Sequence, residues 1–336
     1  MRLGVDAMGG DFAPTEVVRG AISARDILEE GDQIVLAGQR EAIEPLLNEC
    51  PDWRSFIRIA HSPEVVGMDD PPVEAVRAKP NSSIALLAKM HKQKEVDAII
   101  SAGNTGACVA AWQMNLRRLA GVHRPGIAVI MPTFHNPIVL CDVGANVDCR
   151  PQHLFQYAIM ASLYLEHVGG VKSPRIGLLS IGSEAAKGNA LVKKTRDLLK
   201  SASGLKFVGN VEGRDLLRDV CDVIVCEGFV GNVCLKLMEG LADGLFKGLT
   251  AQLGKADPAV ASQAKALFRS ILGRYDYSEV GGAPLLGVNG ICIISHGSSK
   301  ARAIRSAILK ARQFATQGVN ELITTHLGRY DTGNGE

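Results

Sequence analysis

Polar side chains that could bind or activate a small anion are concentrated in five short turns. The turns are rich in Gly, Asn and acidic residues, and each follows a short apolar run; they lie at 6–11, 101–106, 142–146, 180–184 and 227–232. Such a run, rich in Val, Ile and Leu and bounded by Gly, is typical of a strand buried on both faces. A turn between a buried strand and a helix directs backbone N–H groups at a bound anion. We therefore expect an anion site assembled from several strand ends.

The turns in the first half of the chain supply glycines for close backbone approach and polar side chains that can cap a helix or bind phosphate. In 101–106, Asn104 is an expected donor to a phosphate or an oxyanion, and the alternative is a purely structural turn. A lysine beside a capped helix start at 79–83 is a second candidate phosphate site. The substrate-binding candidates here, with one asparagine from 142–146, are Asp6, Gly9, Gly10, Lys79, Ser82, Ser83, Thr105, Gly106 and Asn146.

The second half of the chain places an acid, a lysine and an amide close together after an apolar run. These residues are Glu184, Lys187 and Asn189, and directly after a buried strand we expect them to face a cleft. On a surface helix the same residues would form only a solvated Glu/Lys pair. Asn232 repeats the amide after the next such run, and Lys236 lies one turn further on.

His296 is the histidine best placed for general acid or base catalysis, because it follows the last predicted strand at a helix start. Ser298 and Ser299 come next, and Ser298 could simply be an N-cap. The chain lacks the G-x-S-x-G elbow, the P-loop and an ordered G-x-G-x-x-G after its first strand. The following helix has a basic flank, which is either a solvated face or a docking surface for an acidic partner protein. Its arginines are Arg302, Arg305 and Arg312.

The elements that must position these residues alternate between strands and helices. Strands are predicted near 2–6, 33–37, 56–60, 97–101, 126–131, 138–142, 175–181, 205–209, 222–226 and 288–294. Helices are predicted near 14–29, 82–92, 106–119, 153–167, 186–200 and 213–219. This alternation predicts an α/β domain over 1–330 with helices on both faces of a mostly parallel sheet, a long C-terminal helix and a tail at 331–336. Only 132–137 separates two of the strands, so an antiparallel hairpin and a mixed sheet are expected there.

An amphipathic helical hairpin is expected as an insertion at about 231–273. In its first helix Gly240, Gly244 and Gly248 form a stripe of small residues. Each glycine costs a helix about 1 kcal/mol relative to Ala, so we expect a close approach of another helix, from this chain or from a second subunit. The alternative is a hairpin whose tip, at 253–272, dips into a membrane surface.

Composition narrows the class of protein. The chain has 336 residues, 46% of them apolar, and its net charge of +2 gives no support for binding nucleic acid. The eight cysteines include no C-x-x-C pair, so a zinc site is not expected. Several cysteines lie in apolar runs, which suits reduced thiols in the cytoplasm. Because neither a signal peptide nor a membrane-spanning run is visible, we expect a cytoplasmic protein.

Taken together, the motifs resemble those of the bacterial phosphate acyltransferases of phospholipid synthesis, over nearly the whole chain. The resemblance rests on seven ordered segments, which are 6–11, 101–107, 142–146, 187–189, 228–232, 277–287 and 296–299. It implies a three-layer α/β/α, Rossmann-like fold related to phosphotransacetylases, a homodimer, and peripheral association with the inner face of the cell membrane. No cofactor and no metal are expected.

The resemblance also implies the substrates, which are long-chain acyl carrier protein and inorganic phosphate. The acyl-phosphate formed would serve glycerol-3-phosphate acylation, with the membrane-bound glycerol-3-phosphate acyltransferase as a further partner. In a compatible mechanism, turn N–H groups and Lys187 bind phosphate, Asn104 or Asn232 stabilises the oxyanion, and His296 or solvent protonates the leaving thiolate. The basic flank would receive the carrier protein.

Two other classes of function also fit parts of the sequence. A metal-dependent dehydrogenase of related architecture would need clustered Asp ligands and an arginine-rich pocket, and the Asp-rich turns are few for that. A non-catalytic scaffold built on the amphipathic hairpin would bind anionic vesicles even after the turn residues were changed to Ala.

Overall fold

The computed structural model describes residues 1–253 and 281–330, which form one eleven-stranded sheet. The strand order is β3-β2-β1-β4-β11-β10-β5-β6-β9-β7-β8. The strands are β1 (Arg2–Asp6), β2 (Gln33–Gly38), β3 (Ile57–His61), β4 (Ala98–Ser101), β5 (Gly126–Met131), β6 (Ile138–Cys141), β7 (Arg175–Leu179), β8 (Lys206–Val211), β9 (Val223–Val225), β10 (Ala283–Leu286) and β11 (Cys292–Ile294).

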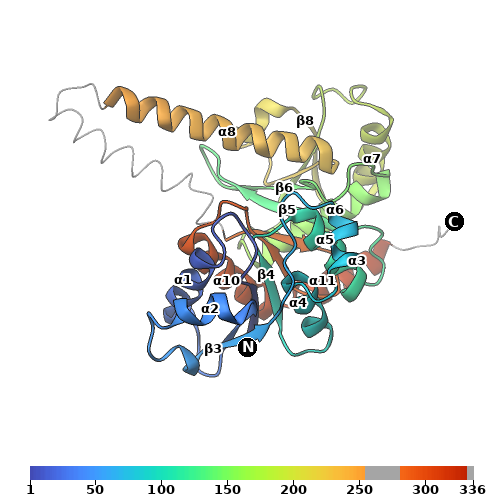
Figure 1. The fold of residues 1–336 in the computed structure, drawn as a ribbon. Coiled ribbons are helices and arrows are strands. Elements are labelled where there is room, and N and C mark those ends of the chain that lie inside the picture. The colour runs from blue at the N-terminus through green and yellow to red at the C-terminus, as the bar shows by residue number, and fades with distance from the viewer. Residues whose placement is uncertain (254–280, 331–336) are drawn as a thin grey trace.

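Helices cover both faces of the sheet, as Figure 1 shows. They are α1 (Thr15–Ser23), α2 (Arg40–Leu47), α3 (Pro72–Ala78), α4 (Ser83–Lys92), α5 (Thr105–Leu116), α6 (Pro151–His167), α7 (Ala190–Ser201), α8 (Gly228–Leu253), α10 (Ala301–Thr316) and α11 (Val319–Tyr330). Because successive strand residues point to opposite faces, Ile99 packs in the core with α4 and α5, while Ile100 packs in the core with α1 and α10. The predicted three-layer α/β/α fold is confirmed.

The sheet changes direction near its middle. The strands β3, β2, β1, β4 and β11 run parallel to one another, and so do the strands β6, β9, β7 and β8. Between these two sets, the pairings β11–β10, β10–β5 and β5–β6 are all antiparallel. The predicted hairpin and mixed, mostly parallel sheet are therefore confirmed. The two sets of parallel strands, which we call the first and second halves of the sheet, run in opposite directions.

Because of this reversal, strands of the two halves end at opposite edges of the sheet, although an anion site assembled from several strand ends was expected. The central strands are nevertheless shifted along one another, and this shift brings strand ends of the two halves close together. Strand β10 pairs with β11 through Ala283 and Pro284 but with β5 through Leu285 and Leu286. As a result the carboxyl ends of β11 and β6 overlap beside β5 and do not lie a full strand length apart.

Local signals explain where other predictions were wrong. The strand β10 and the helices α2 and α3 were missed, and the predicted helix at 213–219 is a 3-10 turn, Gly213–Leu217. The long C-terminal helix is divided into α10 and α11, because Gly318 adopts a φ of 60°, where glycine commonly ends a helix. The last predicted strand is shorter than expected, since β11 begins only at Cys292.

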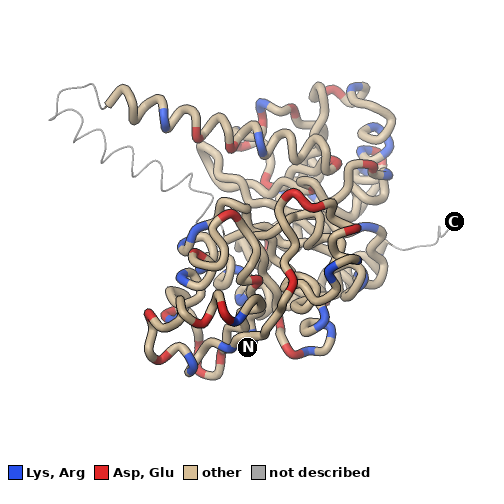
Figure 2. Tube along the Cα trace, viewed as in Figure 1, with Lys and Arg blue, Asp and Glu red and all other residues tan. Residues whose placement is uncertain are grey.

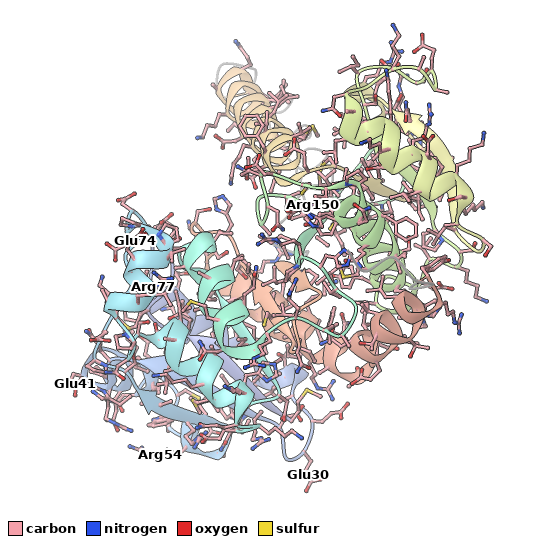
Figure 3. The ribbon with its side chains drawn as sticks, turned by 90° about the vertical axis from the view of Figure 1, so that its right-hand side faces the viewer. Glu30, Glu41, Arg54, Glu74, Arg77 and Arg150 are labelled. Atoms are coloured by element: carbon pink, nitrogen blue, oxygen red, sulfur yellow. The ribbon has the colours of Figure 1, made fainter. Side chains whose placement is uncertain are left out.

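The first helix of the predicted insertion is α8, which extends away from the sheet (Figure 1). The rest of the predicted hairpin, including most of its tip, lies outside the described residues. Figure 3 shows charged side chains such as Glu41, Arg54 and Glu74 on the outer surface of the first half. Within the described ranges, no helix is both long enough and apolar enough to cross a membrane.

Candidate active site

A cleft of about 950 Å³ lies between α8, the central strand β5 and the start of α10. The two halves of the sheet both contribute to it, because His296 follows β11 whereas Asn232 lies on α8, just after β9. The predicted site residues that line it are Thr105, Gly106, Asn232, His296, Ser298, Ser299 and Arg302. The overlap of strand ends beside β5 therefore produces the cleft.

Close packing behind α8 fixes the direction of its first turn. A Cβ added at Gly231 would lie 1.9 Å from the backbone oxygen of Asp142, and one at Gly228 would lie 2.6 Å from the oxygen of Asn146. Since only glycine fits at these positions, the first turn of α8 packs directly against the turn after β6. The Glu227 carboxylate caps this start by accepting hydrogen bonds from the backbone N–H groups of Phe229 (2.7 Å) and Val230 (3.1 Å). Asn232, one turn along, then faces the cleft.

A buried carboxylate supports this packing from behind. Asp142 is fully buried and accepts backbone hydrogen bonds from Ile127 (2.9 Å), Ala145 (3.1 Å) and Asn146 (2.7 Å). Burial raises the pKa of Asp142 to about 6, although these N–H groups act in the opposite direction. The Asn146 amide donates to the carbonyl of Pro125 and the hydroxyl of Tyr157. Asn146 thus has a structural role in holding the turn.

In the first half of the sheet, the buried carboxylate of Asp6 likewise accepts hydrogen bonds from the turn beside it. The Ser101 hydroxyl donates to its carboxylate at 2.6 Å, and the backbone N–H of Met8 donates at 3.0 Å. Burial raises the pKa of Asp6, and the hydrogen bonds to it act against that shift. A Cβ at Gly9 would lie 2.5 Å from this carboxylate and 2.7 Å from the Gly103 nitrogen, so the turn admits no larger residue.

Some of the backbone N–H groups expected to bind phosphate are used by the protein itself. Buried or capping side chains accept from Met8, Gly103, Ala145, Asn146, Phe229 and Val230 in the turns after β1, β4, β6 and β9. These particular N–H groups are not available to an anion, and phosphate binding by the other turn N–H groups stays a prediction. The start of α10 is also partly used, because the Ala301 N–H donates to Glu16 at 2.9 Å.

Side chains from both halves meet at the polar end of the cleft. The Lys236 ammonium lies 2.8 Å from the Glu239 carboxylate and 2.8 Å from His296 Nε2. Glu239 is itself 3.6 Å from His296 Nε2. On the other side of the ring, His296 Nδ1 is 2.8 Å from the Ser298 hydroxyl. Burial raises the pKa of Glu239, but the hydrogen bonds with His296 and Lys236 outweigh it and lower the pKa overall.

Several predicted residues lie outside the cleft lining. Lys79 donates to the Asp70 carboxylate at 2.5 Å and to the Val65 carbonyl at 2.9 Å. Ser82 and Ser83 are buried, and the Ser82 hydroxyl has no hydrogen-bond partner among the described residues. The remaining ones, Gly9 and Gly10 of the first turn and the exposed group Glu184, Lys187 and Asn189, are not in the lining either. Phosphate binding by Lys187 stays a prediction.

Asn104 has a structural role that sequence reasoning offered only as the alternative. Its side-chain oxygen accepts from the Ala107 N–H at 3.0 Å and so caps α5. Its amide group lies 3.0 to 3.3 Å from the carbonyl oxygens of Gly67, Met68 and Asp70. Two amide protons facing three acceptors leave none for an oxyanion.

The basic flank of α10 is largely neutralised by acids from elsewhere in the chain. Arg305 donates to Asp26 at 2.7 Å, and Arg312 pairs with Asp32 at 2.8 Å and with Glu29. The sequence pattern showed no acid on α10 itself, but the acids come from the segment between α1 and β2. Carrier docking on this flank stays a prediction, and only Arg302 of the three also lines the cleft.

Sequence reasoning missed two residues of the polar end as site residues, Lys236 and Glu239. Their i, i+3 spacing on α8 is typical of an exposed ion pair, and lysines and acidic residues follow one another along this helix (Figure 2). The sequence signal that could have identified them is their spacing from Asn232, because residues one and two helical turns further along lie on the same face of α8. Among the described residues, no group of three His, Cys, Asp or Glu side chains is arranged to hold a metal ion.

Comparisons with known proteins agree over almost the whole chain. A family model described as "Fatty acid synthesis protein" matches residues 1–322. The chain is 47% identical over 321 residues to the phosphate acyltransferase of Desulforamulus reducens, covering 95% of each chain. It is 43% identical over 332 residues to the phosphate acyltransferase of Dictyoglomus turgidum, covering 98% of each.

Solved structures extend the similarity at the level of the fold. A phosphotransacetylase from Streptococcus pyogenes superposes with a TM-score of 0.65 at 17% identity, over 94% of each chain. A 4-hydroxythreonine-4-phosphate dehydrogenase from Klebsiella pneumoniae gives 0.52 at 12% identity, over 94% of this chain and 99% of that one. At these identities the structures show the fold alone. The close relatives show more: this chain is an acyltransferase of lipid biosynthesis and belongs to the phosphate acyltransferase family.

Proposed function

We propose that the protein transfers a long-chain acyl group from the thioester of acyl carrier protein to inorganic phosphate in the cleft between α8 and the end of β11. The product is acyl-phosphate, which serves glycerol-3-phosphate acylation in membrane phospholipid synthesis. The observation that carries this proposal is a single cleft with a charged end and an apolar wall. The charged end contains Lys236, Glu239, His296, Lys300 and Arg302, and the wall contains Val129, Met131, Phe134, Leu241 and Leu245.

The cations at the charged end can bind the phosphate anion, and the apolar wall can contact a fatty acyl chain. A phosphate oxygen attacks the thioester carbonyl, the new C–O bond forms and the C–S bond breaks. The proton of hydrogen phosphate passes to the carrier thiolate, so the reaction balances without another reactant. His296 or solvent is the proposed relay for this proton, and Asn232 is the proposed donor to the tetrahedral oxyanion; both side chains line the cleft. Much of the rate comes from holding phosphate and thioester in contact.

The test is the identity of the product. The protein is incubated with phosphate and an acyl thioester, either of carrier protein or of coenzyme A with the same chain, and acyl-phosphate is measured by phosphorus NMR. We expect acyl-phosphate from the carrier thioester and a slower reaction from coenzyme A. Absence of acyl-phosphate with both donors contradicts the proposal. Loss of activity in chelator would favour the metal-dependent alternative.

Homodimer formation and peripheral membrane contact are parts of the same proposal. The stripe of Gly240, Gly244 and Gly248 supports a dimer, because among the described residues nothing lies within 4 Å of a Cβ added there. Exposed leucines such as Leu237, Leu241 and Leu245 on α8 leave an apolar face to be covered. Sedimentation should give a dimer, and flotation with anionic vesicles should recover the protein. A monomer that stays with the soluble fraction contradicts both.

A further inference from the structure

We propose that Lys236 is the cation that binds phosphate in this cleft, and that Glu239 and His296 hold its ammonium group in place. The inference rests on the proposed function, because it assigns a residue to the phosphate acceptor. Its basis is a contact between the two halves of the sheet: Lys236 Nζ, on α8, lies 2.8 Å from Nε2 of His296, which follows β11.

The hydrogen bonds fix one side of the ammonium group. An ammonium group only donates, and the Glu239 carboxylate accepts one of its protons at 2.8 Å. His296 Nε2 lies 2.8 Å from the same ammonium, while His296 Nδ1 lies 2.8 Å from the Ser298 hydroxyl and accepts from the Ser298 backbone N–H at 3.2 Å. The ammonium protons that face the open cleft are the ones that a phosphate oxygen would accept.

Lys236 lies among several charged side chains of the cleft lining. The charged side chains that line the described part of the cleft, apart from the histidine, are three cations, Lys236, Lys300 and Arg302, and one carboxylate, Glu239. Glu239 is only 20% exposed, whereas Lys236 is 51% exposed and reaches into the open cleft. The carboxylate therefore anchors the lysine from the more buried side and leaves its outer side to the ligand.

The other candidate cations are placed differently. Lys79 is bound to Asp70, and Arg312 is bound to Asp32. Lys187 is exposed on the turn after β7 and is not in the cleft lining. A matched control lies on α8 itself: Lys247 pairs with Asp243 at 2.7 Å in an exposed i, i+4 ion pair, outside the cleft lining.

The experiment measures acyl-phosphate formation against phosphate concentration for the full-length protein and four variants. Lys236→Ala should raise KM for phosphate by about 10- to 100-fold, the effect of losing one charge-assisted hydrogen bond, while KM for the acyl donor stays nearly unchanged. Lys236→Arg should recover part of the loss. Glu239→Gln should raise KM for phosphate by a smaller factor, because it frees the lysine to move without removing its charge. Lys247→Ala should match the wild type.

Two outcomes separate this inference from the proposed function. If the wild type forms no acyl-phosphate, the proposed function fails. If the wild type is active and Lys236→Ala keeps the phosphate KM of Lys247→Ala, the inference alone is overturned. Lys236→Met keeps the aliphatic stem, so it tests the same charge should the alanine variant fail to fold. An unchanged phosphate KM in Lys236→Met would likewise overturn the assignment.

Discussion

Two turns in the second half of the sheet carry the same side-chain types, but the protein holds them differently. An acid, an amide and a lysine follow both β7 and β9; they are Glu184, Asn189 and Lys187 after β7, and Glu227, Asn232 and Lys236 after β9. After β9, glycines that contact the backbone of the β6 turn fix the start of α8 and direct its polar residues into the cleft. After β7, the three side chains are exposed, and the amide caps α7.

The comparison teaches that packing behind a turn, more than the composition of the turn, determines whether its polar side chains reach the cleft. Asn189 accepts from the Val192 N–H at 2.9 Å, which satisfies the helix start without involving the cleft. At the start of α8 the capping carboxylate is Glu227, so Asn232 is left to face the cleft. Changes behind α8 should therefore disturb the site more than changes in the β7 turn.

The largest effect is expected from Gly231→Ala. The added Cβ would lie 1.9 Å from the Asp142 backbone oxygen. Relief of this overlap requires a shift of main-chain atoms, either of α8 or of the turn after β6. We expect a loss of about 3 kcal/mol in the free energy of unfolding, measured by urea denaturation, together with loss of activity. Gly328→Ala on α11 is the control, because a Cβ there meets nothing within 4 Å and should stabilise the helix by up to about 1 kcal/mol. Equal stabilities of the two variants would contradict the account.

A pH-dependent effect is expected from Asp142, whose carboxylate accepts bonds from the turn behind α8. Burial raises its pKa from 3.8 to about 6. A carboxyl group with a raised folded pKa contributes stability that is present below pH 4 and is lost as the pH rises through about 6. The shift corresponds to at most about 3 kcal/mol. Urea unfolding from pH 4 to 7 should show a steeper fall for the wild type than for Asp142→Asn, and parallel curves would count against this assignment.

If Lys236 is the cation that binds phosphate, a smaller effect is expected from Lys187→Ala in the β7 turn. Its side chain is exposed and outside the cleft lining, so KM for phosphate should change by less than about 3-fold, in contrast to the Lys236 variants. Steady-state kinetics with varied phosphate measures this. A rise as large as that of Lys236→Ala would move the phosphate site toward β7.

The smallest effect is expected from Arg305→Ala. Arg305 forms an exposed ion pair with Asp26, and such pairs contribute about 0–1 kcal/mol. KM for carrier protein should stay within about 2-fold of the wild type, since the pair already neutralises this charge. Arg302→Ala, at the cleft, is the comparison and should have the larger effect. A strong loss of carrier affinity in Arg305→Ala would support the predicted docking surface.

Much of the fold could be predicted because its signals are local. Short apolar runs bounded by glycine marked most strands, and the six-residue connection at 132–137 indicated the antiparallel hairpin. The reversal between the two halves could not be predicted, because it depends on β10, whose Pro284 is unusual in a central strand. Without β10 in the predicted strand list, nothing in the sequence indicated that the strands of the two halves run in opposite directions.

Part of the cleft lining could be anticipated for the same reason. Asn232 and His296 follow strands directly, so their position at strand ends was visible in the sequence, and both line the cleft. Lys236 and Glu239 are positioned by the direction of α8, which depends on contacts between Gly231 and the turn after β6. The role of Asn104 could not be decided from the sequence, because an amide that caps a helix and one that binds an oxyanion have the same sequence pattern.

A crystal structure with bound phosphate tests the central claim most directly. The account predicts phosphate density in the cleft, in contact with Lys236 Nζ and close to Asn232, with Glu239 still bound to the lysine. Phosphate beside Lys187 in the β7 turn, with the Lys236–Glu239–His296 group unoccupied, would contradict it.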